Sequence, residues 1–548
     1  MISKGLGWVK DRWKTSDYFF LAAFAGLLAL YLWKLPLGNA DIDETFYLSI
    51  PYRMAKGDSL IVHEWHVSQL WSFLLYPVMK IYLAVASGTE GIVLAFRYVY
   101  LFVHLTAVCI AYVAARKRYG MLAVAAVTLY GIFSPFDIMA LSYNSMGLTM
   151  CFLLVFLNLE RPEARWRHVL NGLLAAGLVL SNPYTVFLYI VYMMYLIAVK
   201  DKEALLYTNI GVGVLAALFF LVVFRRASLH ELLTNFSYAL SDSAHQKKTF
   251  QDFVTPIKDF GNRFFVFPVM FGLFSVLAYK HREGRRIWTL GLGGTALFMA
   301  VSFAVSETQG LGMCLIMFPL TSFGVALFLL RKEKDRRMLC VGILFPVMYA
   351  MCMHMSSNQG MYVIANACAV SSCVTVLLFG SWLNENFETK RQIAIILSVL
   401  FVCQAGAEIY EKTHHVFWED GVAQLTEEIT FGPLKGIRTT KEKKEKHESV
   451  IKDVKTIKAS SDETILFYEL MPCGYFVTKA AFGTYSAWTE DPNRMAQYYE
   501  VHPEKVPDIV YVFAETYAKW TPSQWDAYCK SNGYEMTRSG LGNYIMRR

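Results

Sequence analysis

The sequence contains little charge for its length. Only 18% of its 548 residues are Asp, Glu, Lys or Arg, whereas 55% are hydrophobic, and the mean hydropathy is +0.35. A soluble domain of this size is more polar and has fewer unbroken apolar runs. The composition therefore excludes a soluble enzyme and indicates a membrane protein.

Several functional signals are also missing. The sequence has no glycine-rich phosphate loop, no internal repeat and no motif of interleaved basic and aromatic residues, so no nucleic acid is expected as a partner. A cleavable signal peptide is not evident either. The first apolar segment, "DYFFLAAFAGLLALYLWKL", is long enough to span a membrane and lacks a clear small-residue cleavage site. We interpret it as a retained first helix.

Long apolar runs dominate the first 410 residues. Each covers roughly 15 to 24 residues, which suits a bilayer core of about 30 Å. The runs are continuous rather than alternating, which favours helices over barrel strands. They predict a polytopic α-helical membrane protein with about 13 transmembrane helices, at residues 18–36, 92–115, 121–136, 139–159, 168–182, 184–200, 205–224, 264–280, 287–305, 310–330, 338–354, 360–382 and 392–410.

Basic residues are concentrated in the short loops between these runs, for example "RKR" at 116–118 and "RKEKDRR" at 331–337. Such loops face the cytoplasm, so the N-terminus is expected inside. An odd number of helices then places the C-terminal tail outside, together with a first outer loop at 37–91 and a second at 225–263. The pattern suits a multi-pass protein of a bacterial plasma membrane.

The first outer loop contains a further apolar run at residues 67–86. A spanning helix here would reverse the orientation of all that follows and place the basic loops outside. Pro77 and Lys80 also weaken that alternative. We therefore expect an interfacial or re-entrant helix within the loop.

The composition changes abruptly after residue 410. The pattern predicts a solvated amphipathic helix, two buried strands and a helix that begins near a capping Ser and ends at a Gly, at residues 439–460, 463–470, 507–513 and 522–533. Alternating strands and helices predict a small α/β domain. The expected organisation is a transmembrane domain at 1–410 and an extracytoplasmic α/β domain at 411–548.

Few cysteines lie outside the apolar runs. Eight of the ten are within those runs and are expected to be small packing residues. The other two, Cys473 and Cys529, belong to the polar tail. An oxidising outer compartment favours a disulfide between them.

An acidic stretch follows the first helix directly. Residues 38–58 contain Asp41, Asp43, Glu44 and Asp58. Charge next to a membrane helix is costly unless it stays in water or in a polar cavity, so it marks a functional candidate. The alternative is a solvated loop that only marks the end of the helix.

The segment "DIDETFYLSIPYRMAKGD" carries a family resemblance. An N-terminal helix, an outer loop that opens with Asp43-Glu44 and a nearby Tyr47, a multi-helix bundle and an outer soluble domain together resemble the GT-C superfamily of membrane glycosyltransferases. The likeness is closest to the protein O-mannosyltransferase and aminoarabinose transferase branch (glycosyltransferase family 39-like). It implies a GT-C-like fold and transfer of a sugar from a polyprenyl-phosphate donor to a glycan, lipid or protein acceptor at the outer membrane face.

The resemblance also implies site residues. A carboxylate of the first outer loop serves as general base, which is Asp43 here, with Glu44 beside it and Asp41 as the alternative. A carboxylate within hydrogen-bond reach can take the proton of a poorly nucleophilic hydroxyl. The leaving lipid phosphate needs cations, and the outer-face candidates are Arg53, Lys56, Arg225, Arg226, Lys247 and Lys248. The alternative for each cation is an interfacial position among lipid headgroups.

One part of the loop departs from the branch, which often has Lys-Pro-Pro there. Residues 63–72 read "HEWHVSQLWS", so His66 and Gln69 stand where a cation and prolines are expected. The departure leaves the subfamily, donor and acceptor open. Polar residues expected to bind substrate are Tyr47, Asp58, His66, Gln69, Tyr143, Asn144 and Asn358. For the last three, helix capping and turn chemistry are the alternative.

A divalent metal ion stays open as a cofactor. Asp41 and Asp43 offer oxygen ligands, and His63 and His66 of "HEWH" would share a face if they were helical. Oligosaccharyl-transferring members of the superfamily use a metal with such acidic pairs, whereas the mannosyltransferase branch generally does not. The alternative is a polar loop whose histidines have other partners.

Two other functions are compatible with the sequence. One is a lipid or polysaccharide transporter or flippase, which would suit the many helices. The missing inverted repeat and the sizeable outer domain argue against it. The other is a non-catalytic membrane scaffold, which would tolerate replacement of Asp43.

Overall fold

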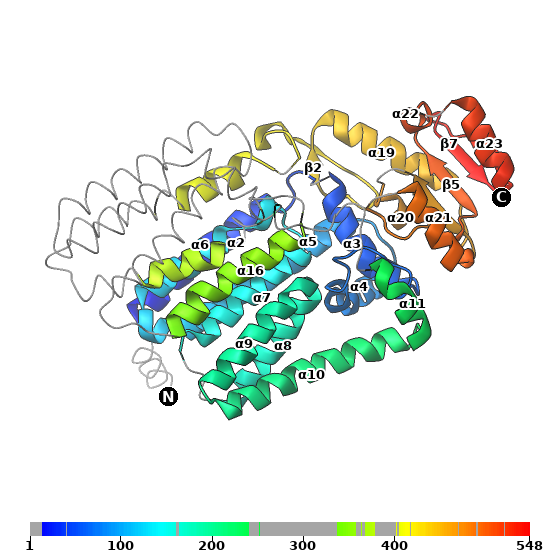
Figure 1. The fold of residues 1–548 in the computed structure, drawn as a ribbon. Helices are drawn as coiled ribbons and strands as arrows, with labels where there is room; N and C mark the ends of the chain where they lie inside the picture. Colours follow the sequence, from blue (N-terminus) through cyan, green and yellow to red (C-terminus); the bar gives the residue numbers. More distant parts are fainter. Residues whose placement is uncertain are drawn as a thin grey trace, which may run out of the picture.

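The structure, a computed structural model, describes residues 14–39, 41–160, 164–239, 251, 337–357, 363, 368–378, 402, 405–416, 418–468, 471–488, 491–519 and 521–548. Within these residues a bundle of helices forms one end of an elongated molecule, and an α/β unit forms the other end (Figure 1). The predicted helices at 264–280, 287–305 and 310–330 lie outside the described residues.

Apolar helices form the bundle where the sequence predicts them. They are α2 (Thr15–Lys34), α5 (Ile92–Tyr119), α6 (Met121–Ile132), α7 (Tyr143–Asn158), α8 (Arg165–Ser181), α9 (Val186–Ala198), α10 (Lys202–Phe224), the π-helical η3 (Met338–Leu344), α16 (Phe345–Met355) and a helix at Ala369–Leu378. The short 3-10 turns η1 (Pro135–Asp137) and η2 (Pro183–Thr185) join neighbouring helices. Of the described helices, α2, α5 and α10 are long and apolar enough to cross a membrane. The apolar helical bundle is therefore confirmed, and the count of 13 spans stays a prediction.

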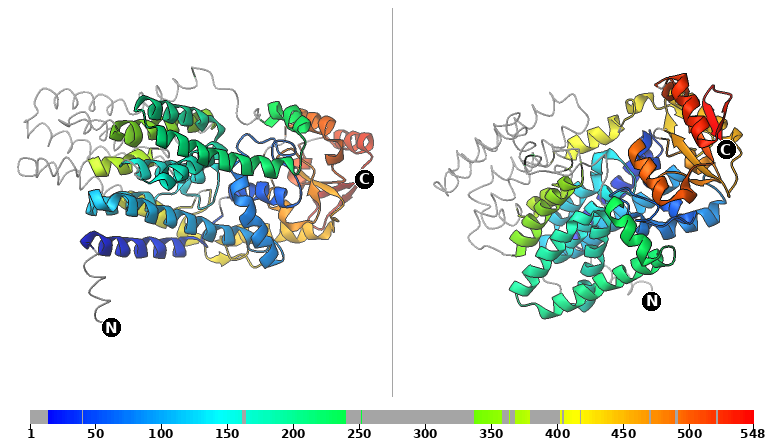
Figure 2. Two further views of the ribbon diagram at one scale, coloured as in Figure 1. Left: turned by 90° about the horizontal axis from the view of Figure 1, so that it is seen from below. Right: turned by 45° about the vertical axis from the view of Figure 1, so that its right-hand side comes forward.

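The bundle helices lie side by side along the long axis of the molecule (Figure 2). Their outer surfaces are apolar. On α5, Val108 and Ala111 are fully buried, whereas Phe102 and Val113 are 72% and 61% exposed. Large apolar side chains at such exposure are unfavourable in water and favourable in lipid. The surface of α5 thus has the character of a membrane-facing helix.

Two glycines bring α8 and α10 into backbone contact. A Cβ atom on Gly172 would lie 2.0 Å from the carbonyl oxygen of Thr208, and one on Gly211 would lie 2.1 Å from that of Val169. Small residues let membrane helices approach this closely and gain dispersion contacts. Glycine is therefore required at both positions.

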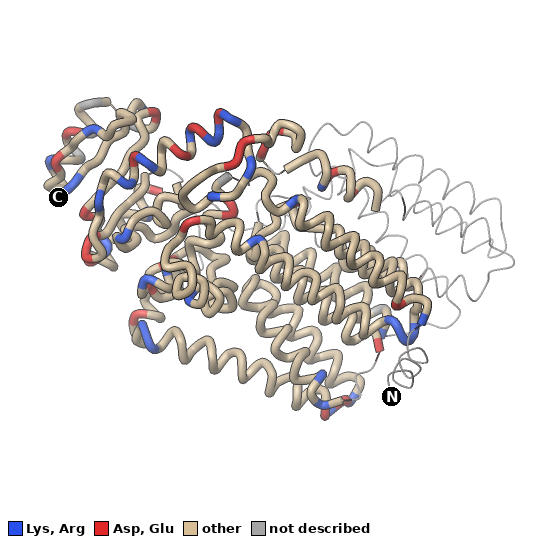
Figure 3. The backbone as a smooth tube through the Cα atoms, turned by 180° about the vertical axis from the view of Figure 1, so that it is seen from behind, with Lys and Arg blue, Asp and Glu red and all other residues tan. Residues whose placement is uncertain are grey.

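Charged residues are sparse along the middle of the bundle and gather at its ends and on the tail (Figure 3). Arg116, Lys117 and Arg118 form the last turn of α5. The acidic stretch lies near the opposite end of that helix, beside the tail. This separation of basic and acidic ends agrees with the predicted orientation, which stays a prediction.

The segments predicted as outer loops contain helices. The first contains α3 (Asp41–Ala55) and α4 (Ser72–Ala86), and the second begins with α11 (Leu229–Ala239). The acidic stretch, expected as a loop, therefore opens a helix. The helix α4 has 15 residues, contains Pro77 and packs against α3 at the junction of bundle and tail (Figure 1). Its length and place match the predicted interfacial helix.

The tail contains a five-stranded mixed sheet. Its strands are β3 (Thr464–Tyr468), β4 (Ala481–Phe482), β5 (Ile509–Val512), β6 (Glu535–Arg538) and β7 (Tyr544–Arg547), in the order β4-β3-β5-β7-β6. The pairs β3–β4 and β3–β5 are parallel, and β5–β7 and β6–β7 are antiparallel. Both predicted strands are confirmed, as β3 and β5. Their alternate side chains pack on opposite faces of the sheet, for example Phe467 on one face and Leu466 on the other.

Helices and short segments complete the tail. They are η4 (Val422–Gln424), α19 (Lys441–Thr456), α20 (Gly474–Val477), α21 (Pro492–Val501), η5 (Pro503–Lys505), α22 (Ala514–Tyr517), α23 (Pro522–Asn532) and the small pair β1 (Glu427–Glu428) and β2 (Arg438–Thr439). The predicted helices at 439–460 and 522–533 are confirmed as α19 and α23. The cap of α23 is Thr521 rather than a Ser, and Gly533 ends the helix with φ +74°. A helix at 405–414 crosses the predicted domain boundary, and the division at residue 410 stays a prediction.

The predicted disulfide between Cys473 and Cys529 is not formed in this structure. Cys473 packs against the core that contains Phe467 and Tyr511, whereas Cys529 is buried in the core that contains Leu466 and Val510. The two cysteines thus belong to opposite faces of the sheet, and a disulfide requires Cα atoms within about 7 Å.

Candidate functional site

The first turns of α3 bring Asp43 and Tyr47 together. They are four residues apart, so they share one face of the helix, and the Tyr47 hydroxyl donates to Asp43 Oδ1 at 3.4 Å. The Tyr47 ring lies edge-on to Trp71 and to Tyr143, with centroid distances of 6.3 and 6.1 Å. The structure thus unites three predicted site residues, Asp43, Tyr47 and Tyr143. Asp43 is half-buried, which leaves part of it open to a reactant.

Burial keeps Tyr47 protonated. Burial, followed by the neighbouring Tyr143 and Asp43, raises the pKa of the Tyr47 phenol well above its usual value. A neutral phenol remains a donor at every physiological pH. Tyr47 therefore stays a hydrogen-bond donor to Asp43.

Glu44 has a structural position. It is 1% exposed, and Arg97 of α5 donates to it through Nε at 2.7 Å and also through Nη2. Arg97 donates as well to the carbonyl oxygens of Leu35 and Gly38, at 2.5 and 2.7 Å. Glu44 and Arg97 thus tie the start of α3 to α5 and to the end of α2. The buried, bidentate pairing indicates a structural role for Glu44, and its catalytic role stays a prediction.

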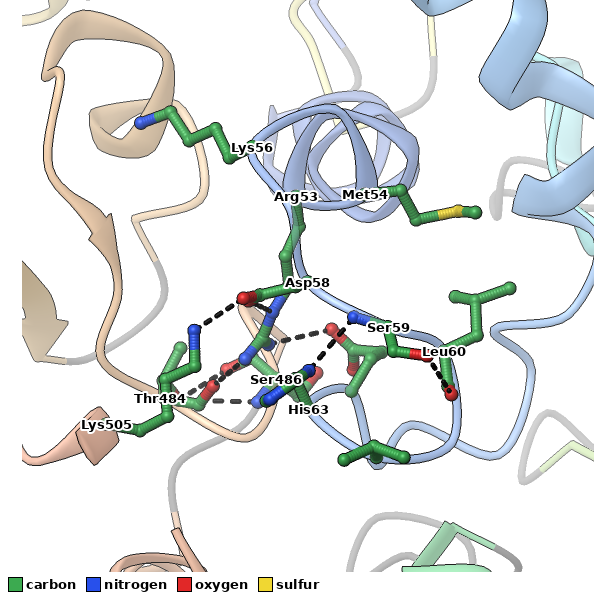
Figure 4. Close-up of polar contacts among 12 residues, drawn as sticks. Arg53, Met54, Lys56, Asp58, Ser59, Leu60, His63, Thr484, Ser486 and Lys505 are labelled. Carbon is green, nitrogen blue, oxygen red and sulfur yellow. Dashed lines mark hydrogen bonds and ion pairs between the residues drawn. The ribbon is translucent and has the colours of Figure 1, made fainter. Parts of the chain in front are cut away.

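Arg53 joins the first loop to the tail (Figure 4). It is 1% exposed and donates to Asp58 at 2.5 Å, Glu64 at 3.1 Å and the Thr484 carbonyl at 2.6 Å. A further bond of 3.0 Å reaches the hydroxyl of Tyr498. These partners give Arg53 a structural position, and its predicted phosphate role stays a prediction.

The acids around Arg53 are held by cations. Burial raises the pKa of the Asp58 carboxyl, but Arg53 and Lys505 outweigh that effect and lower it to about 2. Burial raises the pKa of Glu64 to about 7, with Arg53 opposing the shift. Asp58 is therefore a charged structural anchor, not the substrate ligand that the sequence predicts.

The remaining predicted cations have different positions. Lys56 donates to the carbonyl oxygens of Thr478 and Ala480, at 3.0 and 2.6 Å, and burial lowers its pKa to about 8. Arg226 donates to the Met54 carbonyl at 2.7 Å and so caps the end of α3. The partners of Lys56 and Arg226 indicate structural roles. The side chain of Arg225 is exposed, whereas Lys247 and Lys248 lie outside the described residues.

His66 and Gln69 fold the loop between α3 and α4. His66 is buried, and its Nδ1 accepts from the amide of Ser68 at 3.1 Å. Gln69 accepts from the Ile61 amide at 2.6 Å and donates to the Glu64 carbonyl at 2.7 Å. These buried bonds indicate that Gln69 and His66 shape the loop, and their predicted substrate contacts stay a prediction. Asn358 lies outside the described residues.

The structure groups three possible metal ligands, His63, His502 and Glu504, that differ from the predicted set. His63 and His66 do not share a helix, and His63 lies instead with His502 and Glu504 of the tail, with ligand atoms within 4.8 Å of one another. The geometry does not fit a metal. The Ser59 amide donates to His63 Nδ1 at 2.9 Å, so the proton of the neutral ring is on Nε2, the atom that faces Glu504 at 4.0 Å. Among the described residues no group of three ligands includes Asp43, and nothing is described for the side chain of Asp41.

Lys34, Asp137 and Lys412 form a buried charge cluster at the C-terminal end of α2. The sequence analysis did not predict it. Asp137 of η1 lies 3.3 Å from Lys34 Nζ and 2.8 Å from Lys412 Nζ, and Lys412 also donates to Ser134 at 3.0 Å. The two cations and one acid leave a net positive charge. One sequence feature could have pointed to this cluster. Asp137 is an acid in the two-residue gap between the apolar runs at 121–136 and 139–159. Lys34 and Lys412 each lie at the edge of a separate run, and only the fold joins them.

The η1 turn is strained. Phe136 and Asp137 have φ values of 57° and 55°, a conformation that costs on the order of 1–3 kcal/mol for each such residue. The ion pairs of Asp137 with Lys34 and Lys412 hold the turn in place. Strain of this kind is concentrated at ligand sites and active sites.

A small pocket lies beside this turn, lined by Pro135, Phe136, Asn144, Leu148, Tyr349, Met353 and Val363. Asn144 is in the first turn of α7, which Ser142 caps by accepting from the Ser145 amide at 3.4 Å. The alternative of helix capping is thus realised by Ser142 and Ser145, and Asn144 faces the pocket. A second, apolar pocket lies between α7, α8, α9 and α16 and includes Asn158.

Comparisons with known proteins give a similarity to solved structures only. No family model matches the chain, and no curated protein matches it. ArnT from Cupriavidus metallidurans in the apo state is similar over 97% of this chain and 98% of its own, at 11% identity and a TM-score of 0.45. The same protein bound to undecaprenyl phosphate has the same coverage, 12% identity and a TM-score of 0.42. The assignment of a function therefore rests on the residues of this chain.

Proposed function

We propose that the protein is a membrane glycosyltransferase that moves a sugar from a polyprenyl-phosphate donor to an acceptor, with Asp43 as general base. The reaction would take place at the outer membrane face, with the N-terminus cytoplasmic and the tail outside. The apolar bundle, the basic end of α5 and the resemblance carried by residues 41–58 support this function.

The observation that carries the proposal is the contrast between Asp43 and the other acids of the first loop. Glu44, Asp58 and Glu64 are each buried against an arginine. Asp43 is half-buried and is bonded by the neutral Tyr47 hydroxyl. A general base must be within reach of its substrate, and Asp43 is more exposed than Glu44, Asp58 and Glu64.

The proposed chemistry is a single displacement. Asp43 takes the proton of an acceptor hydroxyl as the acceptor oxygen forms a bond to the anomeric carbon. The bond from that carbon to the phosphate oxygen breaks, and the polyprenyl phosphate leaves with the bonding electrons. The configuration at the anomeric carbon inverts. Tyr47 holds the carboxylate, and Tyr143 forms the adjacent wall.

The leaving phosphate needs positive charge nearby. Among the described cations, exposed Arg225 is the remaining predicted candidate for direct contact. The cluster of Lys34, Asp137 and Lys412 is buried and has a net charge of one positive unit, so it would act through its field.

Turnover of a lipid-linked donor tests the proposal. The protein is placed in nanodiscs and offered a panel of undecaprenyl-phosphate-linked hexoses and pentoses, and release of undecaprenyl phosphate is followed with and without EDTA. We expect release by the wild type and a loss of at least about 100-fold in Asp43→Asn, the low end for a general base. Asp526→Asn, an exposed acid on α23, is the matched control and should retain full turnover.

Three results would oppose the proposal. Equal turnover by wild type and Asp43→Asn would remove Asp43 from the chemistry. Movement of an intact donor across the bilayer without release would indicate a flippase. Absence of both release and donor binding would favour a scaffold. Loss of release in EDTA would add a metal requirement to the reaction.

A further inference from the structure

The helix α11 presents a row of large apolar side chains on its surface. Within the described part of the chain, Leu229, Leu233 and Phe236 are 60%, 68% and 51% exposed. They are four and three positions apart, so they lie one after another along a single face of the helix. Exposed apolar side chains that are arranged in this way are unfavourable in water and mark an interaction surface.

The other sides of α11 have a different character. Leu232 and Asn235 are buried, at 7% and 1% exposure, whereas His230 and Thr234 are polar and exposed. Successive residues of a helix are about 100° apart, so the apolar row lies between the buried side and the polar side. A helix with an apolar and a polar side, placed at the end of a membrane span, is typical of interfacial helices.

We propose that the apolar row of α11 is inserted into the lipid at the boundary between membrane and water, and that α11 thereby fixes the first outer loop and the tail to the bilayer surface. The partner is the acyl region of one membrane leaflet. This inference does not depend on sugar transfer, because it uses only the membrane-spanning character of α10.

The apolar surface of α10 leads directly to that of α11. The helix α10 is long and apolar enough to cross a membrane, and only 22% of its most apolar stretch is buried. Near its end Leu221 and Phe224 are 60% and 50% exposed, and residues 225–228 alone separate Phe224 from Leu229. Figure 1 shows that α11 turns sharply away from the end of α10. The lipid that covers the end of α10 would therefore also reach the apolar row.

Two arginines mark the level of the boundary. Arg225 is exposed at the end of α10, and Arg226 bonds to the hydroxyl of Tyr76 in α4. An arginine at the end of a spanning helix extends its guanidinium to the lipid headgroups. The helix α4, predicted to be interfacial, exposes Ile81 and Val85 at 65% and 80%. Both helices that begin or pack beside this arginine pair thus have exposed apolar side chains.

The buried side of α11 holds the first loop and the tail. Asn235 Oδ1 accepts from Trp65 Nε1 at 3.0 Å and lies 2.9 Å from His502 Nε2. The ring of Tyr238 stacks on Trp65 with a centroid distance of 4.4 Å, and Arg494 donates to the Tyr238 carbonyl at 2.6 Å. Trp65 belongs to the first loop, and His502 and Arg494 belong to the tail. A helix fixed in lipid on one side would therefore hold both segments at the membrane surface.

The size of the apolar row favours lipid over a protein partner. The helix has 11 residues, and three of its side chains form the row. A stable protein–protein interface buries about 800 Å² on each partner, far more than three side chains supply. Lipid insertion has no such minimum, since α10 already anchors the chain in the membrane. The adjacent polar side of α11 suits the headgroup region.

Nitroxide accessibility in nanodiscs tests the insertion. Single cysteines at positions 229, 230, 233, 234 and 236 are labelled, and collisions are measured with oxygen, which concentrates in lipid, and with a water-soluble nickel chelate. The wild type, labelled in parallel, supplies the background from the native cysteines. We expect labels at Leu229, Leu233 and Phe236 to lie roughly 5–10 Å into the boundary between headgroups and acyl chains. Labels at His230 and Thr234 should collide mainly with the nickel chelate.

Leu233→Cys and Thr234→Cys are the matched pair, because they are adjacent in sequence and point about 100° apart around the helix. A thermal unfolding midpoint equal to that of the wild type shows that a labelled variant is folded. If Leu233→Cys does not fold, Leu229→Cys and Phe236→Cys keep the test valid.

Two results would overturn the insertion. Equal collision of the nickel chelate with labels at Leu233 and Thr234 would place the apolar row in water. Labels at Leu229, Leu233 and Phe236 that neither reagent reaches would show that protein covers the row, either another part of this chain or a second copy. Sugar transfer is not measured here, so either result leaves the proposed function to its own test.

Discussion

Arg53 of the first outer loop donates to the carbonyl oxygen of Thr484 in the tail, at 2.6 Å across 431 positions of sequence. The same guanidinium binds Asp58 and Glu64. The acidic loop and the tail are thus one folded unit, and the tail supports the helix that carries Asp43. This arrangement makes the residues of the junction testable by stability as well as by activity.

Replacement of Arg53 should destabilise the junction. Arg53→Ala leaves the buried carboxylates of Asp58 and Glu64 without their shared cation, which costs about 3–5 kcal/mol when one partner of a buried pair is removed. Arg225→Ala changes an exposed arginine and should shift stability by less than about 0.5 kcal/mol. Thermal unfolding in nanodiscs measures both. Equal unfolding midpoints for the two variants would contradict the structural role of Arg53.

Asp43 and Glu44 should separate activity from stability. Glu44→Gln leaves the buried Arg97 without a countercharge, so its unfolding midpoint should fall, with a cost of about 3–5 kcal/mol. Asp43→Asn replaces a half-buried acid and should keep the wild-type midpoint while losing turnover. Undecaprenyl phosphate release and thermal unfolding are measured on the same samples. A stable Glu44→Gln variant without turnover would instead return Glu44 to the chemistry.

Asp58 should make stability depend on acidity. Its folded pKa, about 2, is below the ordinary value of 3.8. The stability contributed by its ionised form is therefore complete above about pH 5 and is lost as the pH falls through 4 toward 2, by about 2 kcal/mol in total. The difference in unfolding free energy between wild type and Asp58→Asn should shrink over that window. A constant difference from pH 6 to pH 2.5 would refute the low pKa.

The contact of α8 with α10 should tolerate no side chain at Gly172. Gly172→Ala places a Cβ 2.0 Å from the Thr208 carbonyl, and a backbone atom cannot move aside without separating the helices. We expect a loss of about 1–3 kcal/mol from overpacking. Gly213→Ala on α10 is the control, because nothing lies within 4 Å of its added Cβ. A Gly172→Ala variant as stable as Gly213→Ala would show that the helices are not in backbone contact.

Local patterns predicted much of the fold. The apolar runs predict helices because a spanning segment must satisfy its own backbone, and α5 and α10 lie where the runs do. The strands β3 and β5 follow from short apolar segments rich in β-branched and aromatic residues. The helix α3 was missed, since its mixed polarity and Pro51 resemble a loop.

The candidate site was predicted only in part. Asp43, Tyr47 and Tyr143 do meet, because two of them share a helix face and α7 brings the third. The residue type of the neighbouring charged side chains did not show whether they bind substrate or stabilise the fold. Arg53 and Asp58 resemble phosphate and substrate ligands in sequence, but the tail supplies their partners from more than 400 positions away. The predicted Cys473–Cys529 disulfide is not formed, because the two cysteines pack on opposite faces of the sheet. The sequence shows that both lie in the tail, but it does not show on which face each one packs.

The sequence by itself determined that this is an apolar helical bundle with a small α/β tail and an acidic stretch directly after the first helix. Hydrophobic periodicity and loop charge are local properties, so they can be read along the chain. The tertiary structure alone decided which acid is anchored and which is accessible, and which amide faces a pocket. Burial and ion pairing depend on segments distant in sequence, and they pair Glu44 with Arg97 while Asp43 stays half-buried beside Tyr47.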